Sequence, residues 1–165
     1  MKDSTKRKIK IDNHLFFTEI SRKFKEGCKS VTFTVYGVSM HPFLDSGRDK
    51  VILVPPMQPQ VGQVILAEIK PATYALHRII KIEDNKITMR GDGNFLSSVE
   101  EFTADKIVGT ATAFIRKGKH VSTDSCTWRW YSATWELVRP LRRCLLAFYR
   151  RIIKKYLRYE TKRRI

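Results

Sequence analysis

Cysteine is scarce in this sequence. The 165 residues include three cysteines, Cys28, Cys126 and Cys144, which are odd in number, widely spaced and free of any Cys-x-x-Cys pattern. Secreted disulfide scaffolds and zinc sites need paired or clustered cysteines, so this distribution argues against both. We therefore expect a chain from a reducing compartment, with no bound metal and no cofactor.

Long hydrophobic runs are also lacking. The longest uncharged stretch, residues 51–67, is interrupted by three prolines and a glycine, so it predicts two strands and a loop. A spanning helix needs about 20 apolar residues. Residues 1–10 are basic, but no apolar segment of the kind found in signal peptides follows them. These features predict a cytoplasmic protein, with the inner membrane face as a possible place of peripheral attachment.

Acidic residues are few towards the C-terminus, and this imbalance accounts for most of the net charge of +16. From residue 139 to the end there are eleven lysines and arginines and one acid, Glu160, whereas the rest of the chain is nearly balanced. A tail of this composition can bind nucleic-acid phosphates or anionic lipid headgroups. The hydrophobic content of 42% and the aromatic content of 11% are typical of a globular body.

Hydrophobic periodicity predicts one helix followed by strands. Asp12 or Asn13 is a candidate N-cap for a helix ending at residue 27, with apolar side chains at helical spacing. The pattern then changes to period two, typical of half-buried strands. The predicted strands are residues 31–36, 50–54, 64–69, 74–82, 87–90 and 107–116. We expect a mainly β fold, with a barrel-like or sandwich-like body.

Three segments follow from these patterns: a basic segment with a helix at 1–29, the β domain at 30–120, and an aromatic linker with a basic tail at 121–165. In the tail, Pro140 is placed to begin an amphipathic helix. Its basic face would contain Arg143, Arg150, Arg151, Lys154 and Arg158. Such a helix fits an acidic membrane surface best and nucleic acid less well, and the alternative is a helix that packs on the β domain.

A serine stands directly after the first predicted strand. Residues 36–42 read Tyr-Gly-Val-Ser-Met-His-Pro, which places Ser39 between Gly37 and Pro42, with Met40 beside it. A serine held in a constrained turn at the end of a strand is a common arrangement for a nucleophile. On its own, this stretch is better explained as an ordinary turn with a solvated serine.

A serine nucleophile needs a neighbouring base, because its hydroxyl is almost never ionised at neutral pH. Of the four histidines, His14, His41 and His120 lie in the leading helix, in a loop and after the last strand. His77 instead lies within a predicted strand among apolar residues, where a neutral imidazole can accept a proton. The alternative is a histidine with a purely structural role.

A glycine-rich turn follows the next predicted strand. Residues 90–94 read Arg-Gly-Asp-Gly-Asn, in which Gly91 and Gly93 allow a tight turn around Asp92. Asp92 or Asn94 is placed to orient a neighbouring side chain or backbone amide. The alternative is a simple Asx turn.

These pieces occur in a specific order: Ser-Met-x-Pro, Gly-Arg-Asp-Lys-Val, Val-Gly-Gln-Val-Ile, His-Arg-Ile-Ile and Gly-Asp-Gly-Asn. The series, over residues 31–116, resembles the peptidase domain shared by type I signal peptidases and the self-cleaving SOS repressors. The histidine before Arg-Ile is similar to the endoplasmic-reticulum and archaeal branch, since the usual bacterial enzymes have lysine there. The resemblance implies Ser39 as nucleophile, His77 as general base and a fold of coiled antiparallel sheets.

The sequence also departs from that family. Residues 47–49 read Gly-Arg-Asp, where the family commonly has Gly-Asp. In the histidine branch an acid a few places after the glycine-rich turn completes a triad, but residues 95–98 are Phe-Leu-Ser-Ser. The candidates for the acid are Glu100, Asp92 and Asp105, in that order, and a Ser-His dyad is the alternative.

The resemblance implies a serine endopeptidase that cleaves a peptide or precursor protein lying extended beside residues 31–36. In this interpretation the basic tail holds the enzyme at the membrane or on a partner. The family's spanning anchors have no counterpart in this sequence. The missing triad acid keeps a second hypothesis open: a peptidase-fold binding module without turnover, whose basic tail binds acidic lipid or nucleic acid. A third, self-cleavage, is not supported by any Ala-Gly pair in an evident linker.

Overall fold

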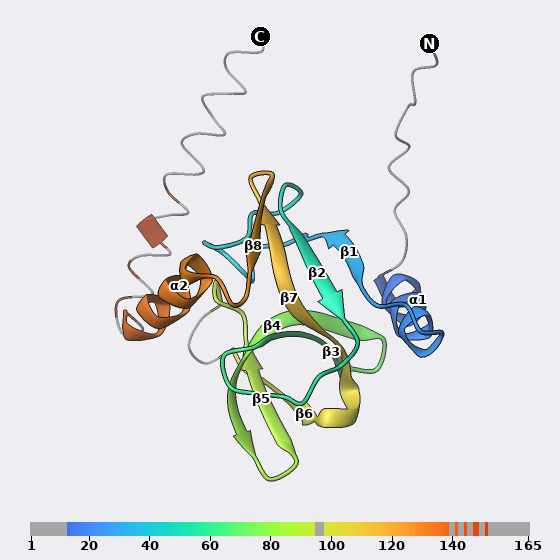
Figure 1. The fold of residues 1–165 in the computed structure, drawn as a ribbon. Coiled ribbons are helices and arrows are strands. Elements are labelled where there is room, and N and C mark those ends of the chain that lie inside the picture. The colour runs from blue at the N-terminus through green and yellow to red at the C-terminus, as the bar shows by residue number, and fades with distance from the viewer. Residues whose placement is uncertain are drawn as a thin grey trace, which may run out of the picture.

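A computed structural model describes residues 13–94 and 98–138, together with residues 141, 144, 147, 148 and 151. Its centre is an antiparallel sheet of eight strands, with helix α1 (Asn13–Lys25) before it and helix α2 (Cys126–Leu137) after it (Figure 1). The strands are β1 (Val31–Thr34), β2 (Lys50–Val54), β3 (Val64–Lys70), β4 (Thr73–Glu83), β5 (Lys86–Arg90), β6 (Glu100–Thr103), β7 (Ile107–Arg116) and β8 (Lys119–Ser122). A short 3₁₀ helix, Ala104–Lys106, joins β6 to β7.

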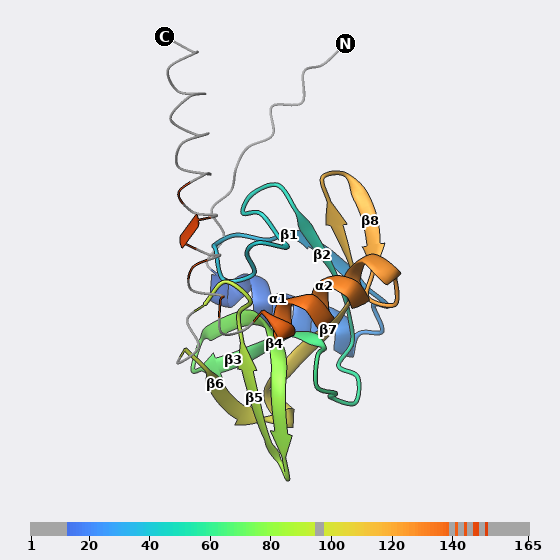
Figure 2. The same ribbon diagram turned by 90° about the vertical axis from the view of Figure 1, so that its left-hand side faces the viewer.

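Strand β7 joins two arms of this sheet. The strand order is β1-β2-β7-β3-β4-β5-β6, and β8 also pairs with β7. β2 pairs with β7 over residues 110–115, β3 pairs with it over 107–110 and β8 over 113–116. The β1–β2 arm and the β3–β6 arm therefore diverge from one shared strand, as the two perpendicular views show (Figures 1 and 2).

The expected barrel-like closure is wrong. β1 and β6 end the strand order, and they do not pair with each other in the described part of the chain. An open sheet of this kind buries its apolar faces by bending and by packing helices against them. Here α1 packs against β4 and β7 and α2 packs near β8, and both helices contribute side chains to the main core; they lie at the right and the left of the sheet in Figure 1.

Strand β3 is buried on both faces, and this divides the core in two. Val64 and Leu66 belong to the main core, whereas Ile65 and Ala67 belong to a second cluster between β3 and the outer strands. Because alternate side chains of a strand point to opposite faces, a strand with two buried faces is a continuous apolar run. The main core also receives side chains from both helices, including Ile20 of α1 and Trp128 of α2.

The structure confirms the leading helix and all six predicted strands, within a few residues at their ends. Two strands, the short 3₁₀ helix and one α-helix were missed: β6, β8, Ala104–Lys106 and α2. β6 reads Glu-Glu-Phe-Thr and has one buried side chain, Phe102, so it has no hydrophobic alternation. The start of α2 had a signal, since Ser125 precedes the helix and its Oγ accepts a hydrogen bond from the Trp128 amide, 3.3 Å away.

The predicted helix after Pro140 lies largely outside the described residues. Arg151 is described and is exposed, whereas Arg143, Arg150, Lys154 and Arg158 are not described. Within the part of the chain that the structure covers, no helix is both long enough and apolar enough to cross a membrane.

Candidate active site

Ser39 lies in the loop between β1 and β2. The loop leaves the strand at Gly37, whose φ of 99° is in the left-handed region that glycine adopts without strain. The Gly37 amide donates a hydrogen bond to Ser46 Oγ, 3.0 Å away, across the loop. Ser39 is half-buried, and Met40 next to it is 2% exposed in the main core. The turn thus buries the residue after Ser39 and leaves the serine at the surface of the core; the His41-Pro42 bond within it is cis.

Asp49 fastens the end of this loop. Its fully buried carboxylate accepts hydrogen bonds from the amides of Asp45 (2.8 Å) and Lys117 (3.0 Å). Arg48 donates two more, at 2.7 and 2.8 Å. Burial alone would raise the pKa of Asp49, but the hydrogen bonds from Arg48 and the two amides outweigh it and hold the pKa below its ordinary value. Arg48 also pairs with Asp45 at 2.6 Å, so its side chain joins both ends of residues 45–49 and stabilises the loop.

A carboxylate whose pKa is lower in the folded state stabilises the fold above the unfolded-state pKa of about 4. That contribution is lost as the pH falls through the folded-state value. We expect Asp49→Asn to lower the free energy of unfolding at pH 7 by about 1–3 kcal/mol. The NH₂ group of asparagine cannot accept the hydrogen bonds that the backbone amides and Arg48 donate to the carboxylate. Urea denaturation at pH 7 and pH 3 should then show that the free energy of unfolding of Asp49→Asn falls less on acidification than that of wild type. Asp124→Asn, at an exposed position, is the control; equal acid sensitivity of Asp49→Asn and wild type would contradict the prediction.

His77 lies within β4 and is 5% exposed. Its Nδ1 atom is 3.0 Å from Oε2 of Glu100, the first residue of β6. Glu100 is partly exposed, with 21% of its side chain accessible. β5 lies between β4 and β6 and pairs with both, so the sheet register brings Glu100 to the imidazole. The first of the three candidate acids is therefore the one that contacts His77.

The other two candidate acids are engaged elsewhere. Asp92 is 2% exposed and forms a two-pronged ion pair with Arg78, at 2.9 and 2.7 Å. Asp105 is exposed; it accepts a hydrogen bond from the Thr103 hydroxyl, and this bond together with Lys106 lowers its pKa. Neither has a hydrogen bond to His77 among the described residues.

The glycine-rich turn fits between Ser39 and His77. A Cβ atom on Gly91 would lie 2.5 Å from the Ser39 carbonyl oxygen and 2.9 Å from His77 Nε2, closer than any real side chain is tolerated. The distance between the Ser39 carbonyl oxygen and His77 Nε2 is therefore at most the sum of these two distances. The Gly93 amide donates a hydrogen bond to the same Ser39 carbonyl at 2.7 Å, and a Cβ there would overlap the Val38 carbonyl oxygen. Both glycines are required because the turn lies directly against the serine loop.

This geometry places the two ring nitrogens of His77 in different surroundings. Nδ1 faces the Glu100 carboxylate, whereas Nε2 faces the turn that contacts Ser39. A carboxylate at Nδ1 fixes the tautomer in which Nε2 is a free acceptor, as a general base requires. Within the described residues no hydrogen bond joins the Ser39 hydroxyl to His77. Such bonds are often long before substrate binds and shorten in the complex.

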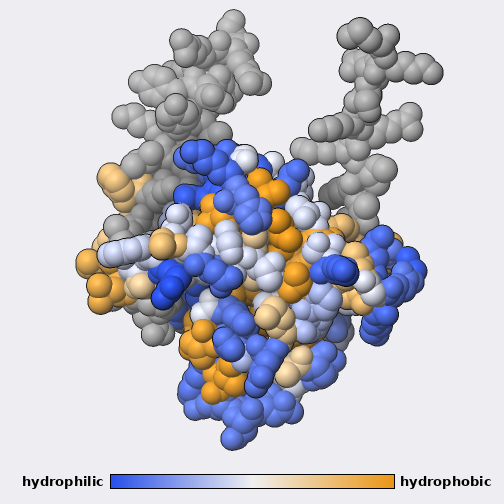
Figure 3. Space-filling model, in the orientation of Figure 1, coloured by the Kyte–Doolittle hydropathy of each residue, from blue (hydrophilic) through white to orange (hydrophobic). Residues whose placement is uncertain are grey.

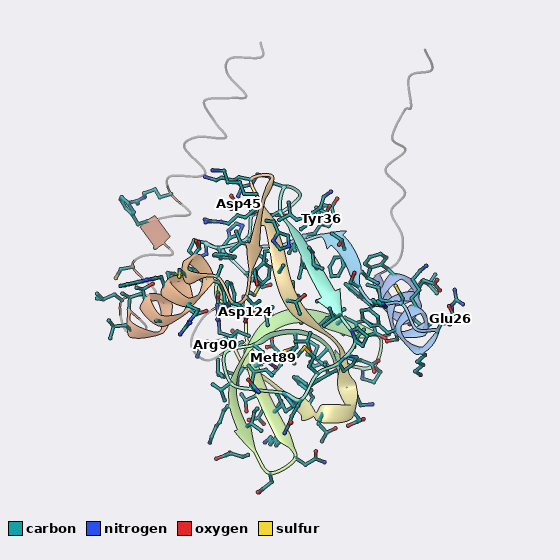
Figure 4. All side chains as sticks on the ribbon, in the orientation of Figure 1. Glu26, Tyr36, Asp45, Met89, Arg90 and Asp124 are labelled. Atoms are coloured by element: carbon teal, nitrogen blue, oxygen red, sulfur yellow. The ribbon has the colours of Figure 1, made fainter. Side chains whose placement is uncertain are left out.

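Asn94, predicted to orient a neighbour, lies in the same turn. Its backbone amide donates a hydrogen bond to the Gly91 carbonyl at 3.0 Å, and its side-chain Nδ2 atom would lie 2.9 Å from a Cβ on Gly91. Figure 4 shows Tyr36 and Asp45 of the serine loop on the upper arm, and Met89 and Arg90 of β5 on the lower arm. The candidate site is thus formed where the loop of one arm meets the turn and strands of the other.

Sequence reasoning missed the contributions of Tyr131 and Trp135. The Tyr131 hydroxyl donates to Asp92 Oδ2 at 2.8 Å, and Trp135 Nε1 donates to the Asp92 carbonyl at 3.1 Å. The signal was present in the cluster of aromatic residues after position 126, which suggested a linker but forms a helix that packs on the site. Among the described residues, no group of three histidine, cysteine or acidic side chains is placed to hold a metal ion.

Comparison of the chain with protein-family models finds no match, and comparison with curated proteins finds none either.

Proposed function

We propose that the protein is a serine endopeptidase of the signal-peptidase-like class. The Ser39 hydroxyl attacks the scissile carbonyl while His77 Nε2 takes its proton. The resulting imidazolium gives that proton to the leaving amine, which departs and leaves an acyl-serine ester. Water then hydrolyses the ester with His77 again as base, so that a carboxylic acid is released and Ser39 is restored. Glu100 holds the imidazole and stabilises its positive charge.

The observation that carries this proposal is the position of His77. Its Nδ1 atom is hydrogen-bonded to a carboxylate, and its Nε2 atom is aimed at the turn that receives the Ser39 loop. A histidine with a purely structural role needs only one satisfied nitrogen and a packed ring. Here three segments distant in sequence, at residues 39, 77 and 100, converge around one imidazole, which is what nucleophilic catalysis requires.

The geometry also supports an extended peptide as substrate. β1 leads directly to the Ser39 loop and pairs on one side with β2, while no described strand pairs with its other edge. The main chain of a peptide can hydrogen-bond to such an edge as an added strand. This would lay the substrate beside β1, with the scissile bond near Ser39.

The proposal is tested with a mixture of internally quenched peptides and a serine-reactive phosphonate probe. We expect the wild-type protein to cleave members of the mixture and to form a probe adduct that mass spectrometry maps to Ser39. Ser39→Ala and His77→Ala should lose both activities, whereas Ser98→Ala, at an exposed serine, should retain them. Cleavage that persists in Ser39→Ala, or a wild-type protein that neither cleaves nor reacts, would refute the proposal.

A second candidate function is a peptidase-fold module that binds an acidic membrane surface without turnover. It is favoured by four exposed apolar side chains near the C-terminus, Trp130, Leu137, Leu141 and Phe148, and by the basic sequence around the last two. Apolar surface lies over the outer part of α2 at the left of Figure 3. This function predicts sedimentation with anionic but not neutral vesicles, and equal binding by wild type and Ser39→Ala. No difference between the two vesicle types would exclude it.

A further inference from the structure

Helix α2 contacts three of the segments that form the candidate site. These segments are the loop of Ser39, the strand of His77 and the turn at residues 91–93. The residues that α2 touches are Phe43, four positions after Ser39, Arg78, directly after His77, and Asp92, at the centre of the turn. No described element other than α2 has polar side-chain contacts to both Arg78 and Asp92.

The contact with the serine loop is aromatic. Phe43, four residues after Ser39, packs with ring centroids 4.8 Å from Trp128 and 4.5 Å from Tyr131. Phe43 is 2% exposed and Trp128 is 5% exposed, so this contact is part of the main core. Aromatic pairs at these distances add to the free energy gained by burial. The loop therefore rests on α2.

The contact with the histidine strand is made through Arg78. Its guanidinium carbon lies 4.6 Å from the centre of the Trp128 ring, and its Nη1 atom donates a hydrogen bond to Ser132 Oγ at 2.6 Å. A cation held over an indole face and bonded to a hydroxyl is restrained in both position and direction. Since Arg78 follows His77 directly, α2 restrains the backbone that carries the imidazole.

The contact with the glycine-rich turn is made through Asp92. Tyr131 donates to its carboxylate, and Trp135 donates to its backbone carbonyl. Gly91 and Gly93 have no side chains with which to pack, so hydrogen bonds must set the position of the turn. In the same turn, the Gly93 amide donates a hydrogen bond to the Ser39 carbonyl oxygen at 2.7 Å. A displacement of Asp92 would therefore move the Gly93 amide, which holds the Ser39 loop.

We infer that Tyr131 and Trp135 are positioning residues, through which α2 holds the turn at 91–93 in the place that aligns Ser39 with His77. The inference rests on the proposed function. It adds that the site is incomplete without the C-terminal helix, although no residue of that helix touches the reacting atoms.

The experiment compares three single substitutions in the full chain. Tyr131→Phe removes only a hydroxyl, and Trp135→Phe removes the indole donor. Trp130→Phe is the matched control, because the same change is made on the same helix at a side chain that is 73% exposed. Two quantities are measured: kcat and KM for cleavage of a peptide from the mixture, and the hydrogen-exchange rate of the Gly93 amide by NMR. The exchange rate at Phe114 in β7 reports global unfolding in each variant.

We expect Tyr131→Phe and Trp135→Phe each to lower kcat about tenfold, with a smaller change in KM, because a hydrogen bond to a charged or buried group is lost. Gly93 exchange should rise about tenfold while exchange at Phe114 rises less. Values equal to those of Trp130→Phe in either measurement, or a change confined to KM, would overturn the inference. If the wild-type protein cleaves no peptide, the proposed function fails, and Gly93 exchange alone still decides whether α2 positions the turn.

Discussion

Exchanging Glu100 for glutamine is expected to lower kcat for peptide cleavage by a factor between about 10² and 10⁴. The carboxylate lies 3.0 Å from His77 Nδ1, and in the proposed mechanism it would stabilise the imidazolium that forms during acyl transfer. A glutamine amide can instead donate to Nδ1, which would move the ring proton to Nε2 and remove the base. KM should change little, since Glu100 acts through the imidazole. The measurement is steady-state kinetics on one peptide at fixed pH.

The adjacent residue supplies the control. Glu101 has the same side chain, but it points to the other face of β6 and pairs with Lys86 at 2.6 Å on the surface. Glu101→Gln should therefore keep wild-type kinetics. If Glu100→Gln also keeps them, the site is a Ser-His dyad and the carboxylate at Nδ1 has only a structural role.

Asp92→Asn is expected to lower the free energy of unfolding by about 3–5 kcal/mol, the range found when one partner of a buried ion pair is removed. Arg78 would remain 3% exposed and charged, held by Trp128 and Ser132 but without its carboxylate. The Tyr131 hydroxyl would lose a charged acceptor as well. The measurement is urea denaturation followed by far-ultraviolet circular dichroism.

Asp105→Asn is the matched control for this second prediction. Asp105 was also a candidate acid, but it lies on the surface, where it pairs with Lys106. Its replacement should leave the denaturation midpoint close to that of wild type. An Asp92→Asn variant as stable as Asp105→Asn would mean that the buried pair contributes no net stability.

The sequence was sufficient to predict the strands that carry the core. Residues 31–34 and 50–54 alternate or are β-branched, and the structure pairs them as β1 and β2. It was not sufficient for β6, because Glu100 and Glu101 are poor strand formers whose place is decided by pairing with β5. Nor did it predict an open sheet, because closure depends on whether the two end strands meet, which no local pattern records.

The candidate site was predictable in part for a similar reason. Ser39 and the glycines at 91 and 93 lie in turns with a local signature, and His77 lies in a strand with a clear pattern. Glu100 was only one of three acids, since its distance to His77 is set by the register of β4, β5 and β6. The role of Tyr131 and Trp135 depends on where α2 docks, and their spacing alone fits any amphipathic helix.

The position of β7 has a consequence for the order of events in synthesis. Ser39 belongs to the β1–β2 arm, His77 and Glu100 belong to the β3–β6 arm, and in the described sheet the two arms join at β7, residues 107–116. Contacts between distant segments form only after the chain between them is available. A chain emerging from its N-terminus therefore exposes Ser39, His77 and Glu100 before the strand that joins their two arms. The proposed activity would switch on only when the last third of the chain has folded, so an unfinished molecule could not digest its neighbours.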